Sequence, residues 1–397
     1  MASPDYAAAL DRTATAAPYE LYGLIRATAE PLGARDVSIY LADFQGVVLQ
    51  AILLSSDLSE PILGEEDVAS SMAGRAFRTG ETVTADRDGE VRVWVPLVER
   101  GERTGVVAFT LAAVDDAILR DCERLGVFAG LLVRSFARAT DLMHLRRRRR
   151  TMTLAAGMQW DLLPPLTVRC AQALACGRLE PAYETAGDAF DYAINDRHID
   201  AALFDGMGHW VGATMLSTLA VGAYRHARRD GDSPGDAYTA VDKAVSGEYD
   251  GEAFVTGILA RLPLDSGELE WTNAGHPAPL LLRRHRVVRE LRCEPSLPFG
   301  LSGSCLEVAT EPLEPGDSVL CFTDGMIEGR SPTGEPFGVE RLTNMLEKQS
   351  ASGQPPEEIL RRLVAEILDF NGGKLRDDAT LMLLWWYGPS RSSVSRF

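Results

Sequence analysis

Two short apolar runs in the second half of the chain each lead into an aspartate followed by a glycine, and this repeat is what most constrains the fold. Residues 199–204 lead into Asp205, and residues 318–322 lead, one residue later, into Asp324. Apolar runs of this length bounded by turn-forming residues predict buried β-strands. A glycine after the acid allows a sharp exit and a close approach of backbone. We therefore expect both acids at the ends of central strands.

Two further acidic positions lie at the opposite ends of predicted strands. Asp377 and Asp378 stand directly before the apolar run 379–384, and Asp188 follows a glycine and precedes residues 190–192. One Asp-Gly pair is more often a turn than a ligand, so the inference depends on the whole set. Carboxylates gathered at one end of a sheet repel one another unless cations neutralise them. An all-oxygen set suits two Mg²⁺ or Mn²⁺ ions, which together can position water for in-line attack on a phosphoryl group.

Composition limits the other possibilities. The chain has 397 residues, which predicts two domains, and a formal net charge of −17, which argues against nucleic-acid binding because such binders need a basic face. Its six cysteines lack the spacing of zinc sites or of a disulfide framework. We find neither a signal peptide nor a run of 18 apolar residues, so we expect a cytoplasmic protein with no membrane segment.

The first part of the chain predicts an α+β domain. Residues 1–16 read as a loose, flexible arm, followed by an amphipathic helix over 19–30. Strands are predicted over residues 37–42, 47–54, 91–97 and 105–111. Residues 71–83, together with the hairpin sequence 95–107, resemble a GAF domain, which we place at residues 17–140. The resemblance implies either a small-molecule ligand, whose identity the residues do not specify, or a dimerisation module.

A long helical pattern connects the two halves. Apolar residues recur every three or four positions from Ile118 to Leu145. This stripe suits either a parallel coiled coil in a homodimer or packing on the domain's own sheet. The arginine run 146–150 favours a solvated face or pairing with the protein's own acids over a membrane or nucleic-acid contact. We predict a helical linker over residues 141–165, a second domain over 166–388 and a flexible tail over 389–397.

Five motifs of the second domain occur in the order typical of PPM phosphatases of the SpoIIE type. They are GDAFD at 187–191, DGMGH at 205–209, NAGHP at 273–277, TDG at 323–325 and DDAT at 377–380. The resemblance implies an αββα sandwich with a dinuclear Mn²⁺ or Mg²⁺ centre that dephosphorylates phosphoserine or phosphothreonine on proteins. The partner it implies is a phosphorylated regulatory protein, such as an anti-anti-sigma factor. The domain ahead of it would act as a sensor that controls the phosphatase through the linker.

The same resemblance assigns the site residues. Asp205 would bridge the two ions, the carbonyl of Gly206 and Asp188 would bind one ion, and Asp324 and Asp377 would bind the other. The resemblance does not distinguish the role of Asp378 from that of Asp377. The predicted catalytic set is therefore Asp188, Asp205, Asp324 and Asp377, with Gly206 and Asp378 as further metal ligands.

Some positions depart from the family pattern and keep an alternative open. Ala186 and Trp210 stand where glycine is usual, and Met207 occupies the place of the histidine that follows Asp-Gly in type 2C relatives. These departures motivate the alternative of a low-activity pseudophosphatase that binds a ligand and a partner. The proton donor is not assigned, and we interpret His276 as a turn residue that hydrogen-bonds neighbouring backbone. A nucleotide cyclase would not explain DDAT or NAGHP, and the Asp-x-Asp-x-Thr loop of haloacid dehalogenase-type enzymes is missing from the sequence.

Overall fold

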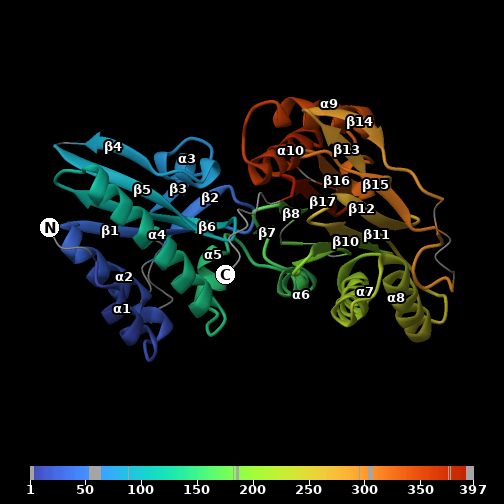
Figure 1. Ribbon diagram of the computed structural model, residues 1–397, viewed down its shortest axis with the longest axis horizontal. Helices are drawn as coiled ribbons and strands as arrows, with labels where there is room; N and C mark the ends of the chain where they lie inside the picture. The colour runs from blue at the N-terminus through green and yellow to red at the C-terminus, as the bar shows by residue number, and fades with distance from the viewer. Residues whose placement is uncertain are drawn as a thin grey trace, which may run out of the picture. The chain divides into compact units, whose positions relative to one another are not determined.

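The computed structural model describes residues 4–52, 64–87, 89–181, 183–184, 187–294, 296–302, 307–373, 375 and 377–389. The chain forms two compact units, residues 1–151 and residues 152–397 (Figure 1). Within the described ranges, no helix combines the length and the apolar character needed to cross a bilayer. Each unit is described by itself.

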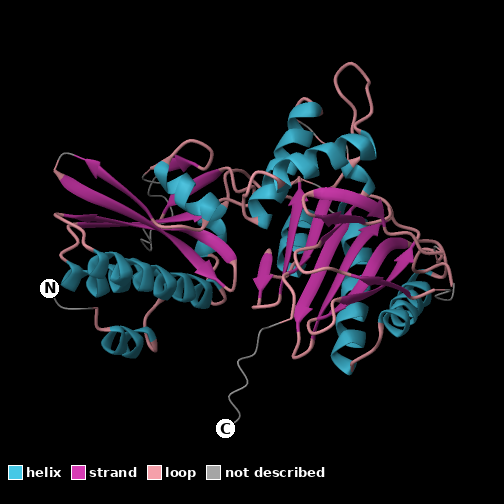
Figure 2. Cartoon of the chain, turned by 45° about the horizontal axis from the view of Figure 1, so that its top comes forward, coloured by secondary structure: helices cyan, strands magenta, loops and turns pink. Residues whose placement is uncertain are grey.

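The N-terminal unit is built on one antiparallel sheet of six strands in the order β3-β2-β1-β6-β5-β4 (Figure 2). Central β1 pairs with β6 over six residues, from Asp36 opposite Thr110 to Leu41 opposite Gly105. Gly105 is required there, since a Cβ would lie 1.9 Å from the carbonyl oxygen of Tyr40. The strands are β1 (Asp36–Ala42), β2 (Val48–Ala51), β3 (Glu65–Asp67), β4 (Val83–Arg87), β5 (Glu90–Glu99) and β6 (Glu102–Leu111).

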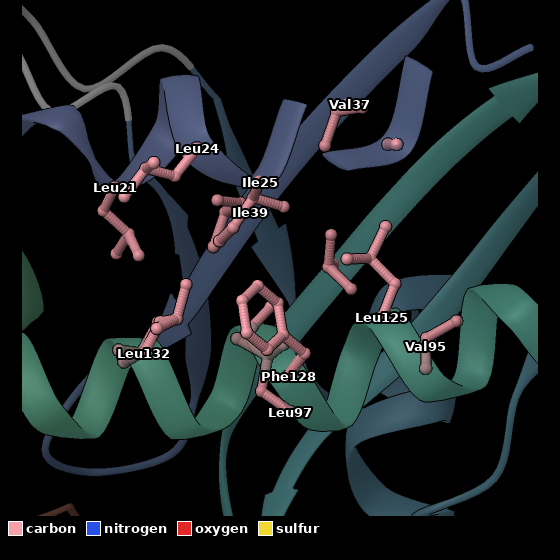
Figure 3. Packing of buried hydrophobic residues seen from close by; sticks show 14 of the residues in the cluster. Leu21, Leu24, Ile25, Val37, Ile39, Val95, Leu97, Leu125, Phe128 and Leu132 are labelled. Atoms are coloured by element: carbon pink, nitrogen blue, oxygen red, sulfur yellow. The ribbon is translucent and has the colours of Figure 1, made fainter. Parts of the chain in front are cut away.

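Helices cover both faces of this sheet. Helix α3 (Met72–Thr79) packs on one face; Ser71 caps its start by accepting a hydrogen bond from the Gly74 N–H, and Gly80 ends it at φ +70°. On the other face lie α2 (Leu21–Ala29) and α4 (Asp116–Ala137), whose apolar stripes meet the sheet in one core. Figure 3 shows this core, to which α2, α4, β1 and β5 all contribute side chains; labelled residues include Leu21, Ile25, Ile39, Leu97, Leu125 and Phe128. The α+β prediction is confirmed, and the GAF resemblance remains a prediction.

Residues 6–13 correct the expectation of a loose arm over 1–16. They form α1 (Tyr6–Thr13), in which the Asp5 carboxylate accepts a hydrogen bond from the Ala8 N–H and Ala9 is buried. The Tyr6 ring meets Phe128 edge-on at a centroid distance of 5.4 Å. A short helix of this length depends on such tertiary packing, which periodicity alone does not reveal.

The structure also corrects the prediction of one long helical pattern from Ile118 to Leu145. The segment forms two helices, α4 and α5 (Leu142–Arg147), separated where the Thr140 hydroxyl accepts a hydrogen bond from the Leu142 N–H. The stripe of α4 packs on the sheet of its own unit, which was the second of the two alternatives. Within the arginine run, Arg146 is buried, and Arg147 donates to the carbonyl of Ala42 and lies 4.7 Å from the Phe44 ring centroid.

The C-terminal unit contains two antiparallel sheets. One has five strands in the order β15-β12-β11-β10-β9, and the other has six in the order β14-β13-β16-β17-β8-β7. The first comprises β9 (Asp188–Ile194), β10 (His198–Gly206), β11 (Val255–Pro263), β12 (Glu268–Ala274) and β15 (Ala309–Pro312). The second comprises β7 (Thr167–Arg169), β8 (Ala173–Glu180), β13 (Leu280–Arg283), β14 (Arg286–Glu290), β16 (Ser318–Phe322) and β17 (Ala379–Trp386).

The two sheets pack face to face and helices cover their outer faces, as the αββα prediction requires. Phe190 and Leu203 from one sheet and Met382 from the other belong to the same buried core. Helices α7 (Trp210–Asp230) and α8 (Pro234–Tyr249) pack on the five-stranded sheet. Helices α9 (Gly338–Ser350) and α10 (Pro356–Phe370) pack on the six-stranded sheet.

The expected linker over 141–165 does not exist as one piece. Its first part, α5, belongs to the N-terminal unit, whereas α6 (Leu154–Leu162) belongs to the C-terminal unit and packs on α7. Helix α6 starts at Thr153, whose hydroxyl accepts a hydrogen bond from the Ala156 N–H. The division falls at residue 151, earlier than the predicted start of the second domain at 166, because α6 has its packing partners in the second unit. The predicted tail beyond residue 389 lies outside the described residues.

Candidate metal centre

Asp205 and Asp188 lie directly opposite each other on adjacent antiparallel strands. The buried run 199–204 forms β10, which ends in Asp205 and Gly206, while β9 begins at Asp188. The register pairs Asp205 with Asp188 and, on the other side, Asp205 with Thr256 of β11. Paired residues direct their side chains to the same face of a sheet. The five-stranded sheet therefore presents two carboxylates at one end.

The six-stranded sheet brings its acids to a corresponding edge. Strand β16 ends at Phe322, two residues before Asp324, and β17 begins directly after Asp378. The Thr323 N–H donates to the carbonyl of Thr380 at 3.1 Å, which extends the pairing of the two strands. A Cβ on Gly325 would lie 1.8 Å from the carbonyl oxygen of Asp378. Glycine is therefore required at 325 to let the two segments approach.

The strand ends of both sheets meet at one pocket of about 220 Å³. It contains the four aspartates predicted as catalytic, together with main-chain and polar groups of neighbouring residues. The lining consists of Gly187, Asp188, Asp205, Gly206, Met207, Gly208, Phe254, Thr256, Asp324 and Asp377.

These carboxylates raise one another's pKa. Burial, followed by the charges of Asp205 and Asp378, raises the pKa of Asp188 well above its usual value. Burial and the neighbouring acids, Asp324 first, raise the pKa of Asp205 to about 7. The pKa of Asp324 is also raised, by burial and then by Glu328 and Asp377. The protein thus holds several acids in a site that disfavours their charge unless a cation is present.

The side chain of Asp378 binds main-chain N–H groups. Its Oδ2 accepts hydrogen bonds from the N–H groups of Gly187 at 2.6 Å and Asp188 at 3.3 Å. It is 4% exposed and is not among the residues that line the pocket. The geometry separates the two adjacent acids: Asp377 faces the pocket, and Asp378 fixes the segment that leads into Asp188.

Hydrogen bonds between the two sheets and from nearby helices hold the pocket wall. Thr323 donates from its hydroxyl to Oδ2 of Asp188 at 2.8 Å, which joins the sheets beside the acids. The Gly206 N–H donates to the Gly187 carbonyl at 3.0 Å, and the Ser217 hydroxyl of α7 donates to the same carbonyl. A Cβ added at Gly187 would lie 3.1 Å from the Gly206 carbonyl oxygen, and one added at Gly206 would lie 3.2 Å from the Gly187 carbonyl oxygen.

The donor set fits hard divalent cations in kind. Four carboxylates, the Thr256 hydroxyl and main-chain carbonyls are oxygen donors of the type that Mg²⁺ and Mn²⁺ prefer. Within the described ranges, no three His, Cys, Asp or Glu side chains are already gathered as a complete set around one point.

Several supporting residues were not identified from the sequence. Gln159 of α6 is 1% exposed, and its Nε2 donates to the main-chain carbonyl of Asp188 at 2.6 Å. Thr256 pairs with Asp205 across the sheet, and its hydroxyl lies 2.8 Å from Nδ1 of His276. Nothing in their sequence context marks Gln159 or Thr256, because both act through contacts between distant segments.

His276 is held in its turn by its main chain, whereas its ring lies beside the Thr256 hydroxyl and not against the neighbouring backbone of the turn as we expected. Its main-chain N–H and C=O bind the Asn273 side chain at 2.6 and 2.8 Å. Burial lowers the pKa of His276 to about 3. The imidazole is therefore neutral near pH 7 and does not supply an imidazolium proton. Of the two positions where glycine is usual in the family, Ala186 lies outside the described residues, and Trp210 is the first residue of α7.

Comparisons with known proteins agree with this architecture. Residues 195–387 match the family model described as Stage II sporulation protein E (SpoIIE). Phosphoserine phosphatase RsbU of Bacillus subtilis is 25% identical over 236 residues, which cover 58% of this chain and 68% of RsbU. Protein IcfG of Synechocystis sp. is 24% identical over 235 residues, but the match spans only 37% of its length and 52% of this chain.

A solved structure supports the fold of the C-terminal unit. The SiaA-PP2C domain of Pseudomonas aeruginosa superposes with a TM-score of 0.50 at 21% identity, covering 58% of this chain and 94% of that domain. The sandwich and the family match make the C-terminal unit similar to serine/threonine phosphatase domains of the PPM class. Within that class, the match over residues 195–387 is to the SpoIIE family.

Proposed function

We propose that the chain is a divalent-metal-dependent phosphatase that removes phosphate from phosphoserine or phosphothreonine of a regulatory protein, for which an anti-anti-sigma factor is the expected class. The observation that carries the proposal is that Asp188, Asp205, Asp324 and Asp377, from both sheets, line one pocket. Support for the substrate class comes from the similarity to the phosphoserine phosphatase RsbU.

Two Mn²⁺ or Mg²⁺ ions would neutralise the acids, activate water and stabilise the charge of the transferred phosphoryl group. Asp205 lies on β10, between β9 and β11, and would serve both ions, with Asp188 and the Gly206 carbonyl on one side. Asp324 and Asp377 would hold the second ion. In the hydrolysis, a water oxygen forms a bond to phosphorus and gives up a proton, the ester P–O bond breaks, and the released alkoxide oxygen of the substrate takes up a proton to become a hydroxyl.

We further propose that the N-terminal unit controls the phosphatase activity through helix α6. Helix α6 is the first element after that unit in the sequence, and it is bonded to the segment that carries Asp188. Thr153 donates from its hydroxyl to the Glu184 carbonyl at 3.0 Å, and Gln159 donates to the carbonyl of Asp188. The Leu162 carbonyl accepts from Arg225, which also binds Asp191 of β9. A displacement of α6 would therefore move Asp188, whether the signal is a bound small molecule or homodimer formation.

Hydrolysis of p-nitrophenyl phosphate with Mn²⁺, with Mg²⁺ and with a chelator tests the catalytic proposal. We expect turnover only with the metals. Asp205→Asn should lower it by more than the roughly 10–100-fold typical of changes to groups that merely support a ligand. Glu248→Gln, on the exposed surface of α8, removes one acid of like charge and should leave the rate unchanged. Equal, near-zero rates for all three proteins under every condition would contradict the proposal and favour the pseudophosphatase alternative.

A further inference from the structure

Trp210 has a backbone conformation that disfavours its side chain. It is the first residue of α7, with φ +69°, in the left-handed region that glycine adopts freely and bulky residues rarely do. Its neighbour Gly208, at φ +97°, has the residue type that such geometry favours. A residue held in a strained conformation needs a reason outside local folding.

The side chain of Trp210 contributes little to the fold. It is 63% exposed, and its ring contact within the described residues is with His209, at a centroid distance of 6.1 Å. His209 is itself exposed. The main-chain carbonyl of Trp210 accepts a hydrogen bond from Thr214, which any residue type could provide. The large indole ring is therefore presented to solvent and carries no packing role that would explain it.

The loop before Trp210 forms part of the pocket. Met207 and Gly208 line it together with Phe254, and the Met207 N–H donates to the Phe254 carbonyl at 3.1 Å. Met207 is 44% exposed and Phe254 is half-buried. Met207 and Phe254 at the wall of the pocket, and Trp210 three residues after Met207 at the start of α7, are defined here as an apolar rim.

We propose that this apolar rim binds the residues that flank the phosphorylated side chain of the substrate protein, with Trp210 as a specificity-determining contact. This inference rests on the proposed phosphatase function. The pocket, at about 220 Å³, has room for a phosphorylated side chain but not for a folded partner. The neighbouring residues of an extended segment, spaced about 3.3 Å apart, must then lie outside the pocket, over its rim.

An apolar residue beside the phosphoresidue is the chemistry that fits this rim. Tryptophan is enriched among the residues that dominate binding energy at protein interfaces, because its ring offers a large rigid surface. The acids inside the pocket bind the reacting phosphate only through cations and carry no information about the surrounding sequence. Apolar contact with the rim therefore distinguishes substrates by the residues beside the phosphoresidue.

The strain at Trp210 gives the inference a distinctive test. Trp210→Gly relieves the left-handed strain and removes the exposed ring, so we expect the variant to unfold at the same or a higher temperature. The same substitution should weaken recognition of the substrate. A residue with a purely structural role would not raise stability and lower selectivity together.

The experiment uses the full chain with Mn²⁺ and three substrates. These are p-nitrophenyl phosphate and two phosphothreonine peptides that differ only in having leucine or serine on both sides of the phosphothreonine. We expect the unsubstituted protein to prefer the leucine peptide by about tenfold in kcat/KM, mainly through KM. Trp210→Gly should remove that preference, while Trp210→Phe should retain part of it. Val288→Ser, at an exposed apolar position of β14, is the matched control and should change nothing.

Each contrary result has one meaning. Metal-independent or undetectable hydrolysis of p-nitrophenyl phosphate by the unsubstituted protein overturns the phosphatase function and this inference with it. Normal hydrolysis with equal use of the two peptides, or a preference that survives in Trp210→Gly, overturns the inference alone.

Discussion

The carboxylate of Asp378 accepts a hydrogen bond of 2.6 Å from the main-chain N–H of Gly187, across 191 positions of sequence. This bond connects the start of β17 in one sheet with the segment entering β9 in the other. It makes Asp378 a positioning residue for Asp188, in contrast to the ligand role that the adjacent Asp377 is predicted to have.

Substitution of Asp378 separates these two roles. Asp378→Ala leaves buried N–H groups without an acceptor, so we expect a loss of about 1–3 kcal/mol in unfolding free energy and about 10–100-fold weaker Mn²⁺ binding. Asp378→Asn keeps an acceptor oxygen and should preserve most of both. Thermal unfolding and calorimetric Mn²⁺ titration measure the two quantities. If Asp378→Asn loses metal binding as completely as Asp377→Asn, Asp378 is itself a ligand.

Gln159 provides a second test of how the site is held. Gln159→Leu removes the donor to the Asp188 carbonyl while keeping a side chain of similar size. It also removes the buried Oε1, for which no partner is found among the described residues. We therefore expect only a small change in stability, together with about tenfold weaker Mn²⁺ binding. Leu154→Ala, at a 71% exposed position of the same helix, should affect neither. Unchanged metal affinity in Gln159→Leu would show that α6 does not position Asp188.

Gly325→Ala should disrupt the contact between β16 and β17. The added Cβ would lie 1.8 Å from a main-chain oxygen that is fixed by the sheet, so one of the segments must move. We expect destabilisation of about 1–3 kcal/mol or more, measured by chemical unfolding. Gly212→Ala in α7 has no atom within 4 Å of the new Cβ and should instead stabilise by up to about 1 kcal/mol. Equal effects of the two substitutions would contradict the close approach.

Burial of His276 predicts a pH dependence of stability. Burial lowers the folded-state pKa of His276 to about 3, whereas in the unfolded chain it titrates near the ordinary histidine pKa of 6.5. The stabilising contribution is therefore complete above pH 6.5. Below that value the unfolded chain binds a proton that the folded protein excludes, so stability falls by about 1.4 kcal/mol per pH unit until the folded pKa is reached.

Urea unfolding of the unsubstituted protein and of His276→Gln between pH 7.5 and 5 measures this effect as a difference between the two slopes. The unsubstituted protein should lose more stability than the variant as the pH falls. Parallel curves would mean that the imidazole is accessible to protons in the folded state.

The sequence predicted the strand ends that carry acids but not the side-chain contacts that organise them. Residues 199–204 and 318–322 could be assigned because each apolar run has clear boundaries. Asp377 and Asp378 are chemically identical neighbours, and only the position of the Gly187 N–H distinguishes them. The contact of Gln159 with Asp188 depends on how α6 packs, which no local pattern encodes.

In the N-terminal unit, too, the sequence pattern did not determine which surfaces pack together. The stripe of α4 has the same spacing whether it meets a second helix or its own sheet, so periodicity could not choose between them. Helix α1 is short and gains its stability from contacts such as Tyr6 with Phe128. Its boundaries therefore could not be predicted from propensity alone.

The division of the acids between the two sheets has a consequence for assembly. Asp188 and Asp205 come from the five-stranded sheet, and Asp324 and Asp377 flank strands of the six-stranded one. A fragment that ends before β16 retains only two of the four carboxylates, however well its own strands fold. Reconstitution of the domain from two separately produced pieces, split in the loop before β16, would therefore switch on metal binding and catalysis at the moment of docking, and not before.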